Sequence, residues 1–152
     1  YSRTDKRNHM KVFGINEKEY RIDLKKYIVR NDDSRKRSSY HLRARDILRG
    51  TFKGYSVLEE VKLPGTRNPS KKSALFLDFL IPSVMIGVEV HGKQHYEFCS
   101  FFHKTKAGFY GHKRRDAIKK EWCEINQITL VEFSYLDTDK DWRKQIDCAR
   151  ET

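Results

Sequence analysis

Two apolar segments in the middle of the chain constrain its fold most strongly. The first is ALFLDFLIP, residues 74–82, and the second is VMIGVEVHG, residues 84–92. Both are hydrophobic almost without interruption, which is typical of strands that are covered on both faces. The Pro82-Ser83 step predicts a tight, hairpin-like connection between them. The sequence therefore predicts a sheet with helices packed on both sides.

The surrounding segments complete a mixed α/β domain. A helix is expected to start with Ser38 or Ser39 as its cap and to end at Gly50 or Gly54. The next strand, YSVLEEVKLPG, comes before the two apolar segments, and another strand, ITLVEFSY, comes after them. These elements give a mixed sheet that is flanked by helices.

Two more helices are expected in the C-terminal half. RRDAIKKEWCEINQ has Ile118, Trp122 and Ile125 at helical spacing, which predicts an amphipathic helix with that stripe buried. DKDWRKQIDCAR is expected to form the closing helix, with Asp137 or Asp139 as its cap. From the first helix onward the predicted order is α-β-β-β-α-β-α.

The N-terminal part is expected to be an extension of this domain. KVFGINEKEYRIDL predicts two short strands around a turn at Asn16–Lys18, and RNDDSRKRSS is a charged linker. Residues 1–34 are therefore assigned to a β-hairpin extension with its linker. Residues 35–152 are assigned to the main domain.

The charge of the chain indicates a polyanionic partner. The formal net charge is +11 and the pI is about 9.6. An excess of this size favours binding to nucleic acid, because neutralised phosphates release counterions. The three cysteines are odd in number and form no CxxC motif, which fits a reducing compartment. No apolar run reaches the roughly 20 residues of a membrane span and no signal peptide is visible, so a cytoplasmic location without membrane contact is expected.

The apolar strands also carry polar residues that a hydrophobic sheet disfavours. Side chains alternate along a strand, so Glu89 and His91 are expected to share a side, with Asp78 of the neighbouring strand beside Glu89. Two uncompensated carboxylates are costly there. Mg²⁺, Mn²⁺ or Ca²⁺ between them would offset that cost and would activate water against a phosphate. The alternative is that both acids lie at strand ends and meet solvent or a lysine.

These residues also carry a resemblance to a known group of enzymes. The pattern Asp-x10-Glu-x-His at Asp78, Glu89 and His91 is similar to the catalytic strand pair of the PD-(D/E)XK nuclease superfamily. The order LPGTR, LDFLIP, VEVHGKQHYEF and RRDAIKKEWCEINQITLVEF resembles the branch of very-short-patch-repair (Vsr-like) and phage homing-type endonucleases. The similarity covers roughly residues 55–135 and implies a restriction-endonuclease-like core of order α-β-β-β-α-β.

The resemblance implies a Mg²⁺-dependent (or Mn²⁺-dependent) endodeoxyribonuclease. Asp78 and Glu89 would hold the metal, and Gln94 and His95 would position the phosphate or the ligands. His91 stands where the superfamily usually has Lys and many relatives have Asp. This departure leaves open whether His91 is a metal ligand or a proton-transfer group.

Many relatives carry an acid on the first core helix, and its counterpart is less obvious in this chain. The helix offers His41 or Asp46 and no Glu. Glu59 and Glu60 on the following strand are substitutes. Since the two point to opposite faces, only one can reach the site, and Glu60 is favoured.

A lysine from the second helix is expected to replace the missing strand lysine. Lys119 would stabilise the negative charge that develops on the phosphate during cleavage. The alternative is a solvated helix face with an Asp116–Lys120 pair.

The expected DNA path follows two basic segments. Residues 96–113 are predicted to form a long aromatic and basic connection beside the site, in which cations bind phosphates and Phe109 and Tyr110 contact bases. The alternative is that its aromatics only cover the sheet edge. The candidate phosphate-binding residues are Lys93, Lys104, Lys106, Lys113, Arg114 and Arg115, and from the linker Arg35, Lys36 and Arg37. His91, His95, Cys99 and His103 recur every four residues, which leaves a zinc cluster as an alternative.

The sequence thus predicts a site-specific or homing-type DNA endonuclease, phage-encoded and acting in the host cytoplasm. Alternatives are a structure-specific nuclease for branched or single-stranded DNA, and a catalytically inactive DNA-binding module on the same fold. A homodimer is compatible with either class.

Overall fold

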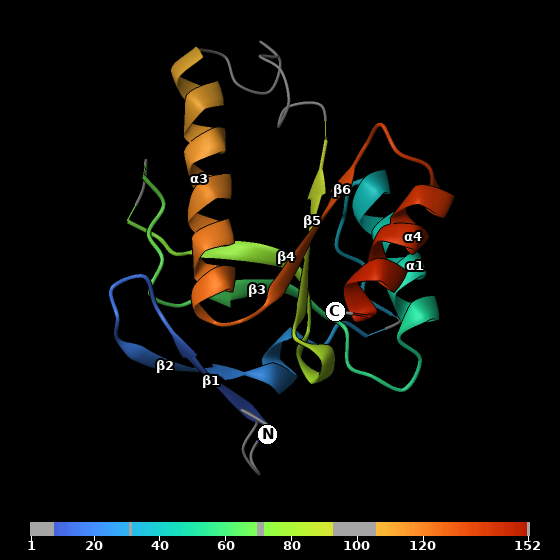
Figure 1. Ribbon diagram of the computed structural model, residues 1–152, viewed down its shortest axis with the longest axis horizontal. Helices are drawn as coiled ribbons and strands as arrows, with labels where there is room; N and C mark the ends of the chain where they lie inside the picture. The colour runs from blue at the N-terminus through green and yellow to red at the C-terminus, as the bar shows by residue number, and fades with distance from the viewer. Residues whose placement is uncertain (1–7, 31, 70–71, 93–105, 152) are drawn as a thin grey trace.

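The computed structural model describes residues 8–30, 32–69, 72–92 and 106–151 of the chain (Figure 1). The helices and strands, in chain order, are β1 His9–Phe13, β2 Glu19–Asp23, the 3-10 helix η1 Leu24–Tyr27, α1 Ser39–Thr51, β3 Leu58–Leu63, β4 Leu75–Ile81, the 3-10 helix η2 Pro82–Val84, β5 Ile86–His91, α3 Lys106–Ile125, β6 Thr129–Ser134 and α4 Asp139–Arg150.

The centre of the fold is a mixed sheet of strand order β3-β4-β5-β6. β4 is antiparallel to both of its neighbours, whereas β5 and β6 run parallel because α3 connects them. Helices α1 and α4 cover one face, while α3 and the separate β1–β2 hairpin lie on the other side (Figure 1). The mixed α/β architecture expected from the sequence is confirmed, including the element order from α1 to α4.

Each face of the sheet has its own hydrophobic cluster. On the α1 and α4 side, Trp142 stacks on Phe133 with ring centroids 4.5 Å apart, and both are fully buried. On the other side, Met10 and Val12 of the hairpin belong to the same cluster as Trp122 of α3. The N-terminal hairpin therefore shares its hydrophobic cluster with the central sheet.

In β3 and β4 the alternation of side chains between the two faces of the sheet is interrupted at the same level. On β3, Leu58 and Val61 face the same cluster although they are three positions apart, and Glu60 between them has a φ of +50°. β4 shows the same shift around Asp78, which the strand register places across from Glu60. This local distortion lies where β4 and β5 stop pairing, and it positions the site described below.

The second long helix begins earlier than the sequence predicts. α3 starts at Lys106, so the expectation of an irregular connection up to residue 113 is wrong for 106–113. Gly108 and Gly111 read as loop signals, but glycine weakens a helix by only about 1 kcal/mol and blocks no backbone hydrogen bond. Residues 93–105 of the expected connection lie outside the described part of the chain.

The buried face of α3 also differs from the expected stripe. Trp122 is buried as predicted, whereas Ile125 is 41% exposed. Its place is taken by Cys123 and Asn126, which are almost fully buried. The rotation of the helix places Lys119, one turn before Trp122 and Cys123, on the side that faces the sheet.

The helices α1 and α4 are capped by residues with short polar side chains. Ser38 caps α1 as expected, and its side chain accepts a hydrogen bond from the backbone of His41. The expected cap of α4 at Asp137 or Asp139 is wrong, because Thr138 forms a reciprocal capping box with Asp141. Among the described residues, no helix is long and apolar enough to cross a membrane.

Polar contacts fix the hairpin to α3 and to the turn after β3. The side chain of Asn126 accepts a hydrogen bond from the backbone nitrogen of Phe13 (2.7 Å) and donates one to its carbonyl (2.8 Å). The indole nitrogen of Trp122 donates to the carbonyl of Pro64 at 2.9 Å. Beside this turn the backbones of Gly14 and Gly65 touch, since a Cβ on Gly65 would lie 2.2 Å from the Cα of Gly14.

Gly65→Ala is expected to destabilise the protein far more than Gly54→Ala. Both glycines have a positive φ, +80° and +86°, but a Cβ on Gly54 would meet no atom within 4 Å. The strained φ alone costs about 1–2 kcal/mol, and the clash at Gly65 adds at least about 2 kcal/mol. Urea unfolding of the two variants measures the difference. Equal losses would show that the hairpin does not pack closely on this turn.

Candidate active site

Asp78 and Glu89 meet where β4 and β5 separate. The ladder between these strands runs from the pair Ile81–Ile86 to the pair Phe79–Val88. Beyond it, the backbone nitrogen of Asp78 donates to Oε2 of Glu89, and that of Val90 donates to Oδ2 of Asp78, both at 2.8 Å. Each carboxylate therefore takes the place of a backbone acceptor on the opposite strand.

Lys119 of α3 completes this group. Its Nζ donates to Oε1 of Glu89 at 2.6 Å. Both partners are largely buried, with side chains 16% and 4% exposed. Asp78, Glu89 and Lys119 were each predicted as site residues, and the structure brings the three together.

The electrostatics of the group favour one more positive charge beside the carboxylates. Burial raises the pKa of Asp78 well above its usual value, and the nearby charge of Glu89 raises it further. Burial disfavours the charged form of Lys119, but Glu89 and Asp78 outweigh this effect and raise the pKa of Lys119. The ammonium thus stays protonated, and the carboxylate pair favours one additional positive charge.

The donor atoms of the pair fit a hard divalent cation. Both side chains offer carboxylate oxygens, of which Oδ2 of Asp78 and Oε2 of Glu89 each accept one backbone hydrogen bond. The described ranges contain no group of three or more His, Cys, Asp and Glu side chains that could hold a metal ion. Mg²⁺ commonly binds one or two carboxylates and takes its remaining ligands from water and substrate phosphate, so two acids suffice.

His91 lies beside Glu89 and is held by a residue that the sequence analysis missed. It is buried, and its Nε2 is 3.2 Å from Oε1 of Glu132 on β6. The hydrogen bond with His91 lowers the pKa of Glu132, although partial burial opposes the shift. A signal was present in ITLVEFSY, where an acid interrupts a core strand as Glu89 does in the neighbouring strand.

The other candidate acids are placed differently. Glu59 is fully buried on the α1 side, where Nε2 of His41 lies 2.7 Å from its Oε1. Arg45 donates to both of its oxygens, at 2.8 and 2.9 Å. Glu60 is half exposed, with an ion pair to Arg37 at 2.8 Å, and Asp46 is exposed. None of these side chains therefore joins Asp78 directly, although Glu60 lines the same pocket.

A pocket of about 720 Å³ opens beside the carboxylate pair. Asp78 and Lys119 line it together with Glu60 and with Arg115, which lies one turn before Lys119 on α3. Its remaining walls come from the end of η1 and the segment after it, from the linker, from β3, from the loop between β3 and β4 and from the start of β4. Asp78 and Lys119 are thus accessible to a ligand larger than water.

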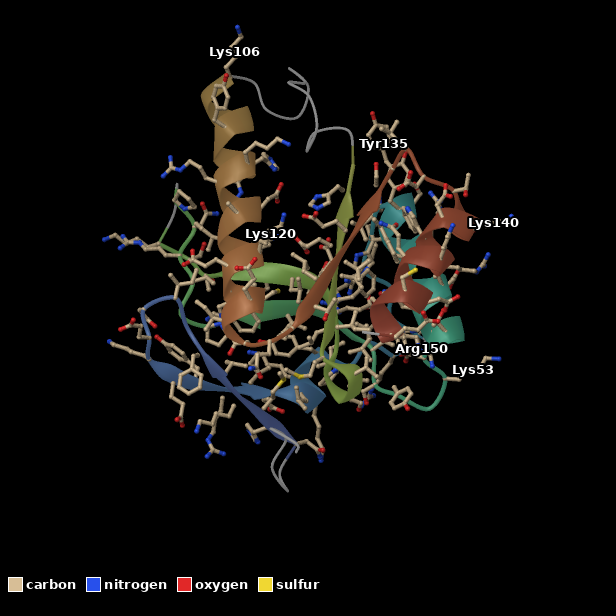
Figure 2. The ribbon with its side chains drawn as sticks, viewed as in Figure 1. Lys53, Lys106, Lys120, Tyr135, Lys140 and Arg150 are labelled. Carbon is tan, nitrogen blue, oxygen red and sulfur yellow. The ribbon has the colours of Figure 1, made fainter. Side chains whose placement is uncertain are left out.

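Most of the described residues that were predicted to bind phosphate are exposed. Lys106, Lys113 and Arg114 are exposed on α3, and Figure 2 shows Lys106 at the free end of that helix. In the linker, Lys36 is exposed, and the Arg35 side chain is 64% exposed with an ion pair to Asp33 at 3.0 Å.

Arg37 does not fit its predicted role in DNA binding. Its side chain is only 3% exposed and forms ion pairs with Asp33, Glu59 and Glu60. Four predicted site residues, and most of the alternative zinc cluster, lie outside the described residues: Lys93, Gln94, His95 and Lys104, with Cys99 and His103.

Comparison with known proteins finds similarity to viral proteins. "Uncharacterized protein 033L" of Invertebrate iridescent virus 3 is 39% identical over 69 residues, covering 45% of this chain and 36% of that protein. "Uncharacterized protein 307L" of Invertebrate iridescent virus 6 is 37% identical over 79 residues, covering 52% and 40%. "Uncharacterized protein 094L" of Frog virus 3 is 34% identical over 82 residues, covering 53% of each chain.

The matched segments span about half or less of the length of these relatives. No protein-family model matches the chain, and no solved structure matches it.

Glu59→Gln is expected to lower the free energy of unfolding by about 2–3 kcal/mol at pH 7. Burial opposes ionisation of Glu59, but hydrogen bonds from His41 and Arg45 lower its pKa from 4.5 to about 2. A depressed pKa contributes stability above the unfolded-state value, and this contribution is lost as the pH falls toward 2. The difference between parent and variant should therefore shrink between pH 5 and pH 3 in urea titrations.

Glu60→Gln is the matched control, since its side chain is 50% exposed. Its effect should stay below about 1 kcal/mol. A Glu59→Gln difference that does not change with pH would contradict the proposed stabilisation of the carboxylate.

Proposed function

We propose that the protein is a metal-dependent DNA endonuclease that hydrolyses phosphodiester bonds. The observation that carries this proposal is the convergence of Asp78, Glu89 and Lys119 beside an accessible pocket. Two carboxylates with one ammonium are suited to a divalent cation and a substrate phosphate. Mg²⁺ or Mn²⁺ bound there would supply Lewis-acid activation of water and neutralisation of the phosphate.

The order of elements supports a restriction-endonuclease-like core. α1, β3, β4, β5, α3 and β6 follow in the order that the resemblance implies, and the two acids lie on its central strands β4 and β5. In this proposal Asp78 and Glu89 hold the cation through their carboxylate oxygens. The pairing of each carboxylate with a backbone nitrogen of the other strand fixes its orientation before a substrate arrives.

Lys119 is proposed to stabilise the charge that develops on the scissile phosphate. It approaches the site from α3, whereas β5 has His91 at the position where the superfamily usually has Lys. Since its pKa is raised, Lys119 acts as a cation and not as a base. His91, oriented by Glu132, is proposed either as a further ligand or as the proton-transfer group of the site.

The proposed substrate is DNA because the chain is strongly basic. The net charge is +11, and α3 carries exposed cations over the half that leads away from Lys119. Cations along one helix can bind successive phosphates of a strand whose scissile bond lies at the carboxylate pair. Site-specific or homing-type recognition, and a phage origin, remain predictions of the sequence.

Asp78→Asn and Glu89→Gln are expected to abolish metal-dependent nicking or linearisation of supercoiled plasmid. Both amides keep the size of the side chain and an oxygen that accepts the backbone hydrogen bond, so folding should be preserved. Lys119→Met should reduce the cleavage rate by roughly 100-fold. Cleavage is measured with Mg²⁺, Mn²⁺ or Ca²⁺ and with EDTA, and circular dichroism checks the fold.

Lys120→Met is the control for the helix lysine, since Lys120 is the exposed neighbour on α3. It should retain cleavage close to that of the parent. Cleavage that persists in Asp78→Asn or Glu89→Gln would refute the assigned centre. A parent protein that binds DNA without cutting it in any of these metals would favour the inactive binding module.

Replacing Lys113 and Arg114 by Ala should weaken DNA binding and flatten its salt dependence. Each lost phosphate contact reduces the slope of log K against log salt by about 0.9. Fluorescence anisotropy at several salt concentrations measures this slope. Lys140 and Lys144 on α4 provide the control pair, because α4 lies on the opposite side of the sheet, as Figure 2 shows for Lys140. An equal effect of both double variants would place the DNA path elsewhere.

A further inference from the structure

The pocket beside the carboxylate pair extends to the N-terminal part of the chain. Lys26 and Tyr27 from the end of η1 line it on one side, and Arg35 from the linker lines it as well. Phe76 of β4, two positions before Asp78, contributes a second aromatic ring. One cavity thus combines the proposed cleavage centre with aromatic and cationic side chains that the cleavage chemistry does not use.

The aromatic lining is accessible, although Tyr27 also packs in part against the cluster that contains Met10 and Trp122. Phe76 is 48% exposed, although it lies within a strand whose neighbours Leu75 and Leu77 are buried. Tyr27 is half-buried, and the Nζ of Lys26 lies 5.6 Å from the centroid of its ring. A ring face and a nearby cation are the two groups that proteins combine to stack a base and to hold its phosphate.

The segment that supplies Tyr27 is fixed in place. Ile28 forms an isolated antiparallel bridge with Leu58 at the start of β3. The guanidinium of Arg49 on α1 donates a hydrogen bond to the carbonyl of Val29 at 3.0 Å. The wall formed by residues 26–29 is therefore anchored to both β3 and α1, and it gives the pocket a defined shape.

Cations predominate among the accessible charges of the pocket. Lys26, Arg35 and Arg115 line it in addition to Lys119, while the accessible acids are Asp78 and Glu60. The third acid on its border, Glu59, has its side chain fully buried among cations of α1. An anionic ligand with a flat ring matches this combination.

We propose that the pocket binds an unpaired nucleotide next to the scissile phosphate, so that the enzyme acts on DNA with single-stranded character. This inference rests on the proposed nuclease function and specifies its substrate. The base lies against Phe76 and Tyr27, and the flanking phosphates contact Lys26, Arg35 and Arg115. The N-terminal extension thereby forms part of the substrate site.

The volume of the cavity suits one unpaired nucleotide. Its volume, about 720 Å³, lies in the range of about 300–1,000 Å³ that is typical of sites enclosing a small ligand. A paired base reaches such a site only after it is flipped out of the helix, which costs a few kcal/mol. An overhang, a flap or a loop presents its base without that cost.

The test compares the binding of a fluorescein-labelled oligothymidylate and of a blunt hairpin duplex that carries the same label. Anisotropy is measured in EDTA, so that neither DNA is cut. The parent protein should bind the single strand more tightly than the hairpin. Phe76→Ala should weaken single-strand binding roughly tenfold and change hairpin binding less than about twofold, as expected for the loss of one stacked base.

Tyr55→Ala is the matched control, because Tyr55 and Phe76 are both 48% exposed and Tyr55 does not line the pocket. It should leave both affinities unchanged, and thermal unfolding confirms that each variant is folded. Unlabelled thymidine monophosphate serves as a competitor and should displace the oligonucleotide only at much higher concentration, since it lacks the flanking phosphates.

Three results would overturn the inference: a parent that binds the hairpin as tightly as the single strand, a Phe76→Ala variant that binds like the parent, or monophosphate that competes as well as the oligonucleotide. The proposed nuclease function is judged separately, by plasmid cleavage in parent and Asp78→Asn. A protein that cuts duplex DNA without preferring single strands would retain the nuclease function and exclude this substrate site. A protein that prefers single strands through Phe76 but never cuts DNA would retain this binding site and exclude the nuclease function.

Discussion

The crossed hydrogen bonds between Asp78 and Glu89 are the interaction on which the rest of the site depends. Strands that pair by their backbones leave no room for a ligand between them. At this point each carboxylate accepts a backbone hydrogen bond from the opposite strand, so β4 and β5 can separate without leaving those nitrogens unsatisfied. The positive φ of Glu60 on β3 accommodates the same distortion one strand further away. The separation of the strands and the acidity of the site thus have one common origin.

Two buried carboxylates of this small protein meet opposite electrostatic conditions. Glu59 is surrounded by His41 and several arginines, and its pKa falls to about 2. Asp78 shares one ammonium with Glu89, and its pKa rises. The first arrangement is neutralised within the protein and stabilises the contact between α1 and β3. The second lacks one positive charge and faces a pocket, which is the condition expected for a group that binds a cation.

The sequence was sufficient to predict the sheet, the order of its elements, and the meeting of Asp78 with Glu89. These features follow from hydrophobic pattern and strand alternation, which are local. The start of α3 at Lys106 was missed because glycines inside a helix resemble loop signals. The burial of Arg37 and the pairing of His91 with Glu132 depend on contacts between distant segments. The acid within ITLVEFSY marks Glu132 as unusual, but the single sequence does not show which residue it pairs with. Lys119 was identified from the resemblance, whereas its position depends on the rotation of α3 about its axis.

That rotation is set partly by the hairpin. The C-terminal half of α3 is attached to β1 through Asn126 and to the turn after β3 through Trp122. Lys119 lies on the same side of the helix, one to two turns earlier. The N-terminal strands therefore help to fix the orientation of Lys119, although they lie outside the proposed catalytic core. A minimal fragment cut at residue 35 would keep every proposed catalytic side chain and lose the reference that aligns one of them. The segment needed to align the proposed site is therefore longer than the segment that carries its motif.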